Sequence, residues 1–495
     1  MQRGMMTTAN GATSRRRTDL LAAEFHYINM PLSEDWFAFP ECPEIMQRLL
    51  RKIGPWIALP GAVVAIMGAV PASSLQGKKK YETVSNQQAV DMLNTIEADI
   101  KEHYYDARMR GLDLDKRFDR AREEINHAKS QDEAFLDIAG ALAALQDSHT
   151  RFIPPVRPYG VDYGWVVQAV GDADCFVTAV RPESDAAQKG IRPGDQVLSI
   201  NGVTVGRQNI SYVEYGYNIF PQAGLRLALR SPDGVSRTIL AMAKVIPGQE
   251  IVRHSDLMAW LRQEHQQKDR SRYFRVGNDT LAWKLPDFLI DPAEVDGLLN
   301  KAHSFQNLVL DLRGNPGGLR SAMDKFIGGF FQKDINVGEM REQKQSQQET
   351  AKSRGNKAFT GKLIVLIDSR SGSAAEIFAR VVQLEKRGTV LGDRSAGAVG
   401  EGKDYLHAVN LDATNVAQYR ARITVAALIM SDGNSLEAIG VTPDERVLPT
   451  PADLAAGRDP ALARALELTG HKITNEEAGR IFPFEWPKEQ MPEID

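Results

Sequence analysis

Apolar positions in residues 84–152 recur at the spacing of amphipathic helices. Val90, Leu93, Ile96 and Ile100 lie three or four positions apart, and the same spacing continues through residues 118–145. Side chains at this spacing share one face of a helix, so the pattern predicts several helices with a common core. Prolines at positions 154 and 155 end the pattern, because proline cannot continue a helix. We therefore expect a helical domain over residues 82–155.

The pattern changes at residue 158 and again near residue 270. Residues 158–246 carry short β-rich runs separated by Gly, Asp and Pro, which predicts a small β-rich domain. From residue 270 to residue 450, short apolar runs alternate with stretches of helical spacing, which predicts an α/β core. We expect polar residues 251–268 to form a helical connector, residues 341–356 a mobile surface loop, and residues 451–495 a helical tail.

The N-terminal 72 residues have the layout of an export signal. Residues 46–52 are short and basic, residues 53–70 carry no charge, and small residues surround position 72. This order is typical of a secretory signal peptide. We interpret residues 46–72 as that signal and residues 1–45 as an upstream extension, and expect a bacterial protein that is periplasmic or extracellular. The alternative is a retained membrane anchor, since residues 53–70 reach the lower limit for a span.

Charge, cysteine and histidine content limit the kinds of partner, cross-link and cofactor that we expect. The 60 basic and 64 acidic residues give a net charge of −4, which does not indicate a nucleic-acid partner. Of the two cysteines, Cys42 precedes the expected cleavage point and Cys175 follows it, so the mature chain cannot form an internal disulfide. The nine histidines have no spacing typical of metal ligands, and we expect neither a metal nor a cofactor.

One turn carries candidate chemistry. The apolar run at 363–367 predicts a buried strand, the helical spacing at 374–384 predicts a helix, and small residues join the two. A tight strand-to-helix turn exposes one side chain and directs helix N–H groups toward it, which suits the stabilisation of an oxyanion. Ser373, between Gly372 and Ala374, is therefore the candidate nucleophile. Its alternative role is that of a small residue that packs at a helix start.

A stretch within the β-rich domain resembles a PDZ domain. Residues 184–202 match the helix, loop, strand and turn at the centre of that fold. The resemblance implies a PDZ-like domain over residues 158–246, with Tyr163, Gly164, Trp165 and Val166 in the loop whose N–H groups receive a peptide C-terminus. Tyr163 and Trp165 are bulkier than the usual residues of that loop, which argues against a free peptide groove.

Several segments in sequence order resemble the C-terminal processing (tail-specific) serine peptidase family. They are residues 147–150, the PDZ-like segment, the glycine-rich stretches at 308–318 and 390–400, the turn at Ser373 and residues 433–444. The resemblance covers residues 84–470 and implies a crotonase/Clp-protease-like α/β core. It also implies that Ser373 attacks a peptide carbonyl, and that the N–H groups of Ala374 and of Gly317 or Gly318 form the oxyanion hole.

The chain departs from this family at the general base. The family's usual lysine lies 25 positions after the serine, where this chain has Ala398. Relatives of the tricorn and chlamydial secreted types use a Ser–His–Glu triad instead, and their histidine precedes the PDZ-like region. His149 and Glu437 match the base and the orienting carboxylate of that triad. A histidine is suited to accept a proton near neutral pH.

Alternatives exist for each of these residues. His149 can instead cap a turn with Asp147 or Ser148, and Lys403 can replace the missing lysine. The role of Glu437 can fall to Asp432 or Glu401. We expect Asp311 and Arg313 to form an internal ion pair, Glu376 to stabilise its helix, and Cys175 to pack as an apolar residue.

The sequence thus favours an exported serine endopeptidase that acts on protein or peptide substrates, with the PDZ-like domain docking or gating them. The alternative from another class is a catalytically degenerate protein that binds peptides or ligands on the same fold. A PDZ-based envelope scaffold is a third possibility. The membrane would be a partner only through an uncleaved N-terminal segment, and the sequence leaves the oligomeric state open.

Overall fold

The computed structural model describes residues 83–157, 159–247, 271–412 and 415–486, all within one compact unit that spans Cys42–Asp495. The expected extension at 1–45, the expected signal at 46–72 and the expected connector at 251–268 lie outside these residues. Among the described helices, none is both long enough and apolar enough to cross a membrane.

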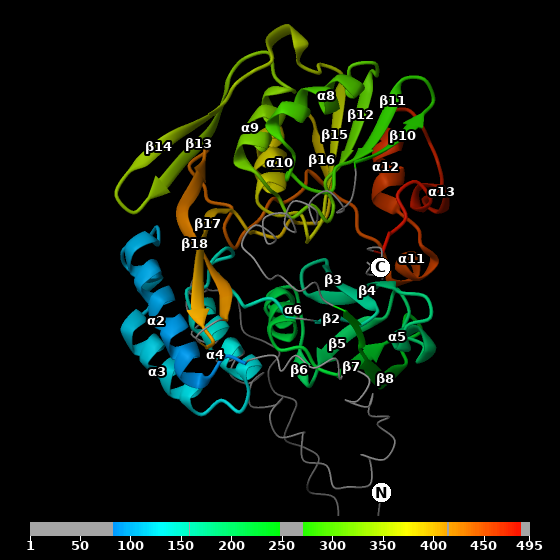
Figure 1. Ribbon diagram of the computed structural model, residues 1–495. Helices are drawn as coiled ribbons and strands as arrows, with labels where there is room; N and C mark the ends of the chain where they lie inside the picture. Colours follow the sequence, from blue (N-terminus) through cyan, green and yellow to red (C-terminus); the bar gives the residue numbers. More distant parts are fainter. Residues whose placement is uncertain (1–82, 158, 248–270, 413–414, 487–495) are drawn as a thin grey trace, which may run out of the picture. The chain divides into compact units, whose positions relative to one another are not determined.

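A six-stranded sheet forms the centre of the α/β core (Figure 1). Its order is β10-β11-β12-β15-β16-β19, in which β10 runs antiparallel to β11 and the other neighbours are parallel. The strands are β10 (Arg272–Val276), β11 (Thr280–Lys284), β12 (Asn307–Asp311), β15 (Lys362–Ile367), β16 (Thr389–Gly392) and β19 (Glu445–Arg446).

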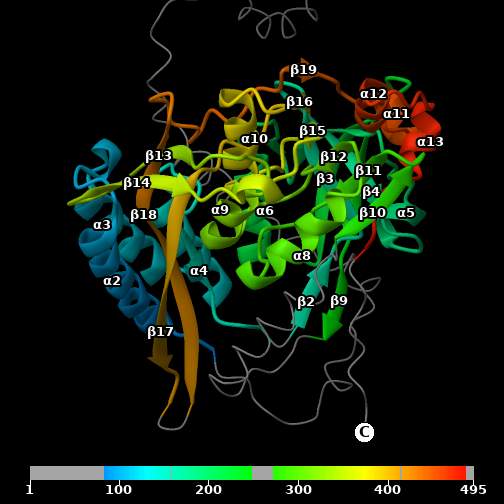
Figure 2. The same cartoon turned by 90° about the horizontal axis from the view of Figure 1, so that it is seen from above.

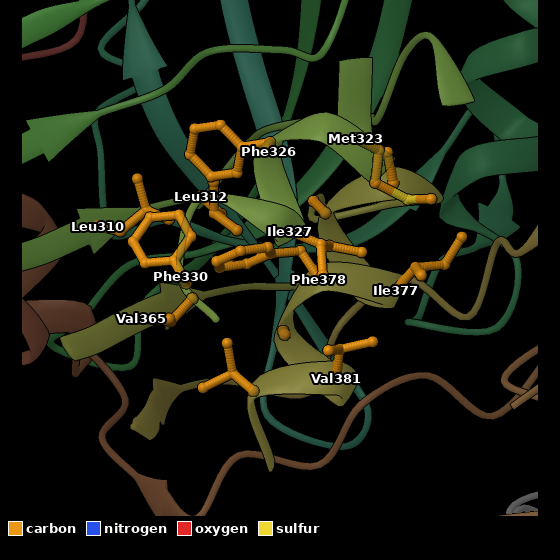
Figure 3. Packing of buried hydrophobic residues seen from close by; sticks show 14 of the residues in the cluster. Leu310, Leu312, Met323, Phe326, Ile327, Phe330, Val365, Ile377, Phe378 and Val381 are labelled. Atoms are coloured by element: carbon orange, nitrogen blue, oxygen red, sulfur yellow. The ribbon is translucent and has the colours of Figure 1, made fainter. Parts of the chain in front are cut away.

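Both faces of this sheet are buried, and alternate side chains of each strand supply the two cores. Leu310 and Val365 face helices α8 (Pro292–Ala302), α9 (Arg320–Gly328) and α10 (Ala374–Leu384), where Phe326 and Phe378 pack edge to face (Figure 3). Neighbouring residues such as Ile364 face the opposite core, which includes α12 (Pro460–Leu468). Burial on both sides explains why β12 and β15 read as continuous apolar runs.

The C-terminal residues of the chain continue the second core. Helices α11 (Pro451–Ala456), α12 and α13 (Asn475–Gly479) follow β19, as the helical pattern predicts. On this side Arg313 bridges Asp311 and Asp459, and the predicted ion pair of Asp311 and Arg313 is thereby confirmed.

The expected helical domain is present. Its helices are α2 (Asn86–His103), α3 (Leu114–Asn126) and α4 (Gln131–Ala143), with the short 3-10 turn η2 (Met109–Gly111) between the first two. Their apolar faces share a core with Tyr419, Ala421 and Ile423 of strand β18 (Val416–Met430). The helical domain is therefore built onto the long strand that returns from the α/β core.

A second sheet connects the helical domain to the core, and it corrects one prediction. Its order is β1-β18-β13-β14, and β17 (Gly400–Asn410) forms a long hairpin with β18 (Figure 2). Strands β13 (Ile335–Glu342) and β14 (Ser346–Ala351) are paired antiparallel, followed by the 3-10 turn η3 (Gly355–Lys357). The expectation of a mobile loop at 341–356 is therefore wrong: these residues include the end of β13 and the whole of the edge strand β14, and a mostly exposed edge strand needs few apolar side chains, so its composition resembles that of a loop.

The β-rich domain has its own core. Its sheet has the order β3-β4-β5-β7-β8, β6 pairs with β5, and β2 pairs with β9. The elements are β2 (Tyr159–Asp162), β3 (Trp165–Val170), β4 (Asp174–Val180), α5 (Asp185–Gln188), β5 (Gln196–Ile200), β6 (Val203–Thr204), α6 (Ile210–Ile219), β7 (Gly224–Arg230), β8 (Ser236–Met242) and β9 (Lys244–Pro247). Cys175 is buried in this core as predicted.

Candidate active site

Ser373 occupies the turn between β15 and α10, where the sequence places it. Its backbone is left-handed, with φ of 49° and ψ of −117°, a conformation that non-glycine residues rarely adopt. Its N–H donates to the carbonyl of Ala398 at 2.8 Å and to Glu376 Oε2 at 3.0 Å. Such strain persists only where the surroundings hold it, and it is typical of functional turns.

The glycine loop after β12 lies directly against this turn. A Cβ atom on Gly317 would lie 2.6 Å from Ser373 Cβ and 3.0 Å from the backbone nitrogen of Ala374, so only glycine fits there. The N–H of Gly317 donates to Asn315 Oδ1 at 2.8 Å. That bond leaves the Gly318 and Ala374 N–H groups as the better candidates for oxyanion donors, since neither has a hydrogen-bond acceptor among the described residues.

Glu376 holds the turn of Ser373 in place through hydrogen bonds. Its carboxylate is fully buried and accepts hydrogen bonds from Ser395 Oγ at 2.6 Å and from the N–H groups of Gly397 and Ala398 at 2.7 and 2.8 Å. Burial raises the pKa of Glu376 to about 7. The predicted structural role of Glu376 is therefore more specific than helix stabilisation, because the side chain ties the loop containing Ala398 to the turn of Ser373.

A short hydrogen-bonded chain joins His149 to Glu437 through Ser148. Ser148 Oγ lies 2.7 Å from His149 Nδ1 and donates to Glu437 Oε2 at 2.9 Å. Glu437 also accepts from the N–H of Ser148 at 2.7 Å and from that of Val399 at 2.8 Å. Glu437 thus does not touch the imidazole directly, and the hydroxyl of Ser148 lies between them.

The hydrogen bonds among His149, Ser148 and Glu437 determine the tautomer of the neutral His149 ring. The only hydroxyl proton of Ser148 is given to the Glu437 carboxylate, so Ser148 Oγ can only accept from His149 Nδ1. The Nδ1–H tautomer leaves Nε2 unprotonated, as a proton acceptor requires. Among the described residues, no hydrogen bond joins His149 Nε2 to Ser373.

The surroundings keep His149 neutral. Burial, with the nearby charges of Arg151 and Arg422, lowers its pKa to about 4, although Asp147 opposes the shift. Burial also raises the pKa of Glu437, against the hydrogen bonds from Val399 and Ser148. At neutral pH the ring is therefore able to accept a proton.

Asp147 holds the segment that carries His149. Its Oδ1 accepts from the N–H groups of His149 and Thr150 at 2.9 and 2.6 Å, and Thr424 of β18 donates to the same oxygen at 2.6 Å. Tyr104 of the helical domain donates to Oδ2 at 2.9 Å. The backbone before β1 (Arg151–Ile153) is thus fixed from both the helical domain and the second sheet.

The alternative residues are engaged elsewhere. Asp432 pairs with Arg380, and Glu401 pairs with Arg320 at 2.7 Å. Lys403 Nζ lies over the ring of Tyr405 at 5.5 Å, and it alternates along β17 with Gly402, which faces His149. These positions favour Glu437 and His149 over the alternatives.

The PDZ-like domain contacts the loop that precedes Ser373. Strand β3 is an edge strand of its sheet, and on the side away from β4 its carbonyl groups of Val167 and Ala169 accept from Arg370 and Ser369, each at 2.5 Å. Arg370 also pairs with Glu214 of α6 at 2.9 Å. The edge to which a peptide strand would add is thus covered by the protein's own loop.

The predicted carboxylate-binding loop is filled as well. Tyr163 and Trp165 are buried in the domain core, and the Gly164 N–H donates to Asp162 at 2.8 Å. Val166 follows in β3. The expectation that bulky residues oppose a free groove agrees with this packing.

Two residues beside the base were missed from the sequence. The sequence offers Ser148 only as a partner for a capping histidine, and it carries no local signal at Arg151. Their positions depend on which residues of β1 pair with β18, and no local pattern reports that register.

Among the described residues, no group of three or more His, Cys, Asp or Glu side chains is arranged to hold a metal.

Comparison with known proteins finds matches to a peptidase family and to a PDZ domain. Residues 281–447 match peptidase family S41, and residues 176–216 match a PDZ domain. The carboxy-terminal processing protease CtpA of Bacillus subtilis is 26% identical over 392 residues, which are 75% of this chain and 71% of CtpA. The carboxyl-terminal-processing protease of Synechocystis sp. is also 26% identical, over 69% of this chain and 78% of its own length.

A solved structure has the same fold. Mature CPAF aligns with a TM-score of 0.57 at 14% identity, over 79% of this chain and 99% of CPAF. The alignments therefore span more than two thirds of both CtpA and the Synechocystis protease.

Proposed function

Since residues 281–447 match peptidase family S41 and the curated relatives are carboxy-terminal processing proteases, we propose that this chain is a serine peptidase of that family. It cleaves peptide bonds with Ser373 as nucleophile, His149 as general base and Glu437 as the carboxylate that acts through Ser148. The observation that supports this proposal is the hydrogen-bonded order of His149, Ser148 and Glu437, which is joined to the strained turn of Ser373 through Val399 and Ala398. Ala398 occupies the position of the family's lysine and cannot move a proton.

Each proton has a destination in this scheme. Ser373 Oγ attacks the carbonyl carbon, and its proton moves to His149 Nε2. The positive ring is stabilised because Nδ1–H donates to Ser148, whose O–H donates to the Glu437 carboxylate. When the C–N bond breaks, Nε2 returns the proton to the leaving amine, and water then hydrolyses the acyl-enzyme by the reverse transfers.

The developing oxyanion would be met by backbone donors. The N–H groups of Ala374 and Gly318 have no other acceptor among the described residues, and Gly317 brings the two loops together. One such donor, placed in advance where charge develops, contributes about 2.7–4 kcal/mol to transition-state stability. Donors of this kind need no side chain, so the glycines serve the chemistry by allowing close approach.

We propose that the PDZ-like domain gates the site. Ser369 and Arg370 lie a few residues before Ser373 and cover the free edge of β3. A peptide that adds to this edge would have to displace them, which links occupancy of the domain to the loop of the nucleophile. Export of the protein, with residues 46–72 as its signal, remains part of the proposal and rests on the sequence.

Cleavage of an unfolded protein tests the proposal. Full-length Ser373→Ala should lose cleavage while its circular dichroism and thermal unfolding match those of the wild type. Arg192→Gln, a change at an exposed residue of the PDZ-like domain, is the control and should cleave normally. Undiminished cleavage by Ser373→Ala would mean that the nucleophile is another residue. Peptide binding without any cleavage by the wild type would favour the degenerate binding protein.

A further inference from the structure

The surface beside His149 carries an exposed arginine, Arg151, which no carboxylate of the described residues contacts as an ion pair. Thr150 and Phe152 are buried, so the alternating positions His149 and Arg151 lie on the other face of this segment, where Arg151 is exposed. Within the described ranges, Arg151 forms no ion pair. An arginine kept unpaired beside a catalytic base is available to a ligand.

A second arginine extends this face. Arg151 and Arg422 are Cα partners across β1 and β18. The Cβ position of Gly402 on β17 lies 3.0 Å from Arg422 Cδ and 3.3 Å from His149 Cβ, so the arginine stem and the histidine meet over the same glycine. The three side chains therefore form one continuous surface, which we call the arginine face.

The arginine face has an excess of positive charge. Arg420 and Arg422 share a single carboxylate, that of Asp404, with contacts of 2.6–3.1 Å. With Arg151, the arginine face and the adjoining Arg420 and Asp404 carry three cations and one anion. Cationic charge also disfavours protonation of the neighbouring His149 ring and so makes it a weaker base. Binding of an anionic ligand by the arginines would offset this effect.

The chemistry of peptide hydrolysis decides which part of a substrate meets this face. The general base must return its proton to the leaving amine, so it stands on the side of the C-terminal fragment. Arg151 lies two residues beyond His149, a backbone span of at most about 7 Å, which is the reach of two extended substrate residues. Resting on the proposed function, we propose that Arg151, supported by Arg422, binds a carboxylate on the substrate within about three residues of the scissile bond, on its C-terminal side.

Two sources can supply that carboxylate. One is the free C-terminus of a short tail, and the other is an Asp or Glu side chain in the leaving segment. Either would form a charge-assisted contact with a guanidinium, which can bind a carboxylate through two parallel N–H groups. The experiment must therefore vary the two sources independently.

Four peptides separate them. A peptide cleaved by the full-length wild type, with its scissile bond mapped by mass spectrometry to the third bond from the C-terminus, is made with a free or amidated C-terminus and with Glu or Gln in the leaving segment. We expect kcat/KM to favour at least one form that carries the carboxylate by about fivefold, the range of an exposed ion pair. Arg151→Gln should abolish the preference, and Arg151→Glu should reverse it toward a Lys-containing peptide.

Arg192→Gln is the matched control, since it removes an exposed arginine from the PDZ-like domain and should keep the preference. Equal rates on all four peptides, or a preference that survives Arg151→Gln, would overturn the inference while leaving the triad intact. Binding of the same labelled peptides to Ser373→Ala, with and without Arg151→Gln, tests the carboxylate contact without any turnover. Loss of the carboxylate preference in that binding supports the arginine face even if His149 proves not to be the base.

Discussion

At the residue scale, the proposed mechanism depends on His149, the proposed base, and on the residues around it. Its ring is half-buried near Arg151 and Arg422 and is linked through the hydroxyl of Ser148 to the Glu437 carboxylate. The arginines favour the neutral ring, and in the proposed mechanism Ser148 and Glu437 stabilise the charged ring during reaction. These two effects oppose each other, so substitutions on either side should be separable by kinetics.

The pH dependence of kcat/KM should reflect the lowered pKa of His149, about 4 against an ordinary value of 6.5. Activity needs the neutral ring, so it should be retained below pH 6.5 and be lost only as the pH falls further toward the folded values of His149 and Glu437. Arg151→Gln removes a cation that opposes protonation, so it should move the acid limb to higher pH. Initial rates from pH 4 to pH 8 on an uncharged peptide measure this. An unchanged limb in Arg151→Gln would mean that Arg151 does not sense the titrating group.

Ser148→Ala should reduce kcat by about 10- to 100-fold with little change in KM, the equivalent of one charge-assisted hydrogen bond of about 1.5–3 kcal/mol. The reason is that the alanine side chain cannot pass stabilisation from Glu437 to the ring. Ser148→Thr keeps the hydroxyl and should restore most of the rate. If Ser148→Ala changed KM alone, or if Thr failed to rescue it, Ser148 would be a packing residue.

At the scale of elements, two loops determine the site. Glu376, in the first turn of α10, holds the loop at 395–398, and Gly317 allows the loop after β12 to lie against Ser373. Strand β3 of the PDZ-like domain accepts hydrogen bonds from the loop that begins this turn. Ser373, the proposed nucleophile, is thus connected to the PDZ-like domain through only a few residues.

Arg370→Ala should free the edge of β3 and increase affinity for a peptide with a free C-terminus. Loss of one charge-assisted contact to a carbonyl predicts a change in Kd of about tenfold. Fluorescence anisotropy of a labelled peptide with full-length Ser373→Ala, with and without the second change, measures it. Arg230→Ala, at an exposed position on β7, is the control. If the peptide binds with equal affinity in the presence and absence of Arg370, Arg370 does not block the edge of β3 and the proposed gating by this loop is wrong.

At the scale of the whole molecule, features that depend on local sequence patterns were predicted, whereas features that depend on long-range strand pairing were not. The helices at 86–143, the buried strands β12 and β15 and the turn of Ser373 all follow from side-chain spacing or from small residues at a strand end. The edge strand β14 and the end of β13 were missed because their side chains are mostly polar and exposed and show no apolar alternation. Ser148 and Arg151 gain their positions from the register of β1 on β18, which joins residues far apart in the sequence.

The same limit applies to the site. Ser373, His149 and Glu437 come from three separate segments, and a family resemblance suggested them together. The sequence could not reveal that a serine hydroxyl lies between His149 and Glu437, since adjacent residues in a chain need not point toward the same partner. Nor could it choose between Gly317 and Gly318, because the choice depends on the bond from Gly317 to Asn315.

The most direct test of the account is the rate at which a serine-directed fluorophosphonate labels Ser373 in the full-length protein. Wild type should label rapidly at pH 7, and Ser373→Ala should not label at all. His149→Ala should label about 10²- to 10⁴-fold more slowly, the usual contribution of a positioned base. If His149→Ala labels as fast as the wild type, His149 does not activate the nucleophile and the proposed mechanism is wrong.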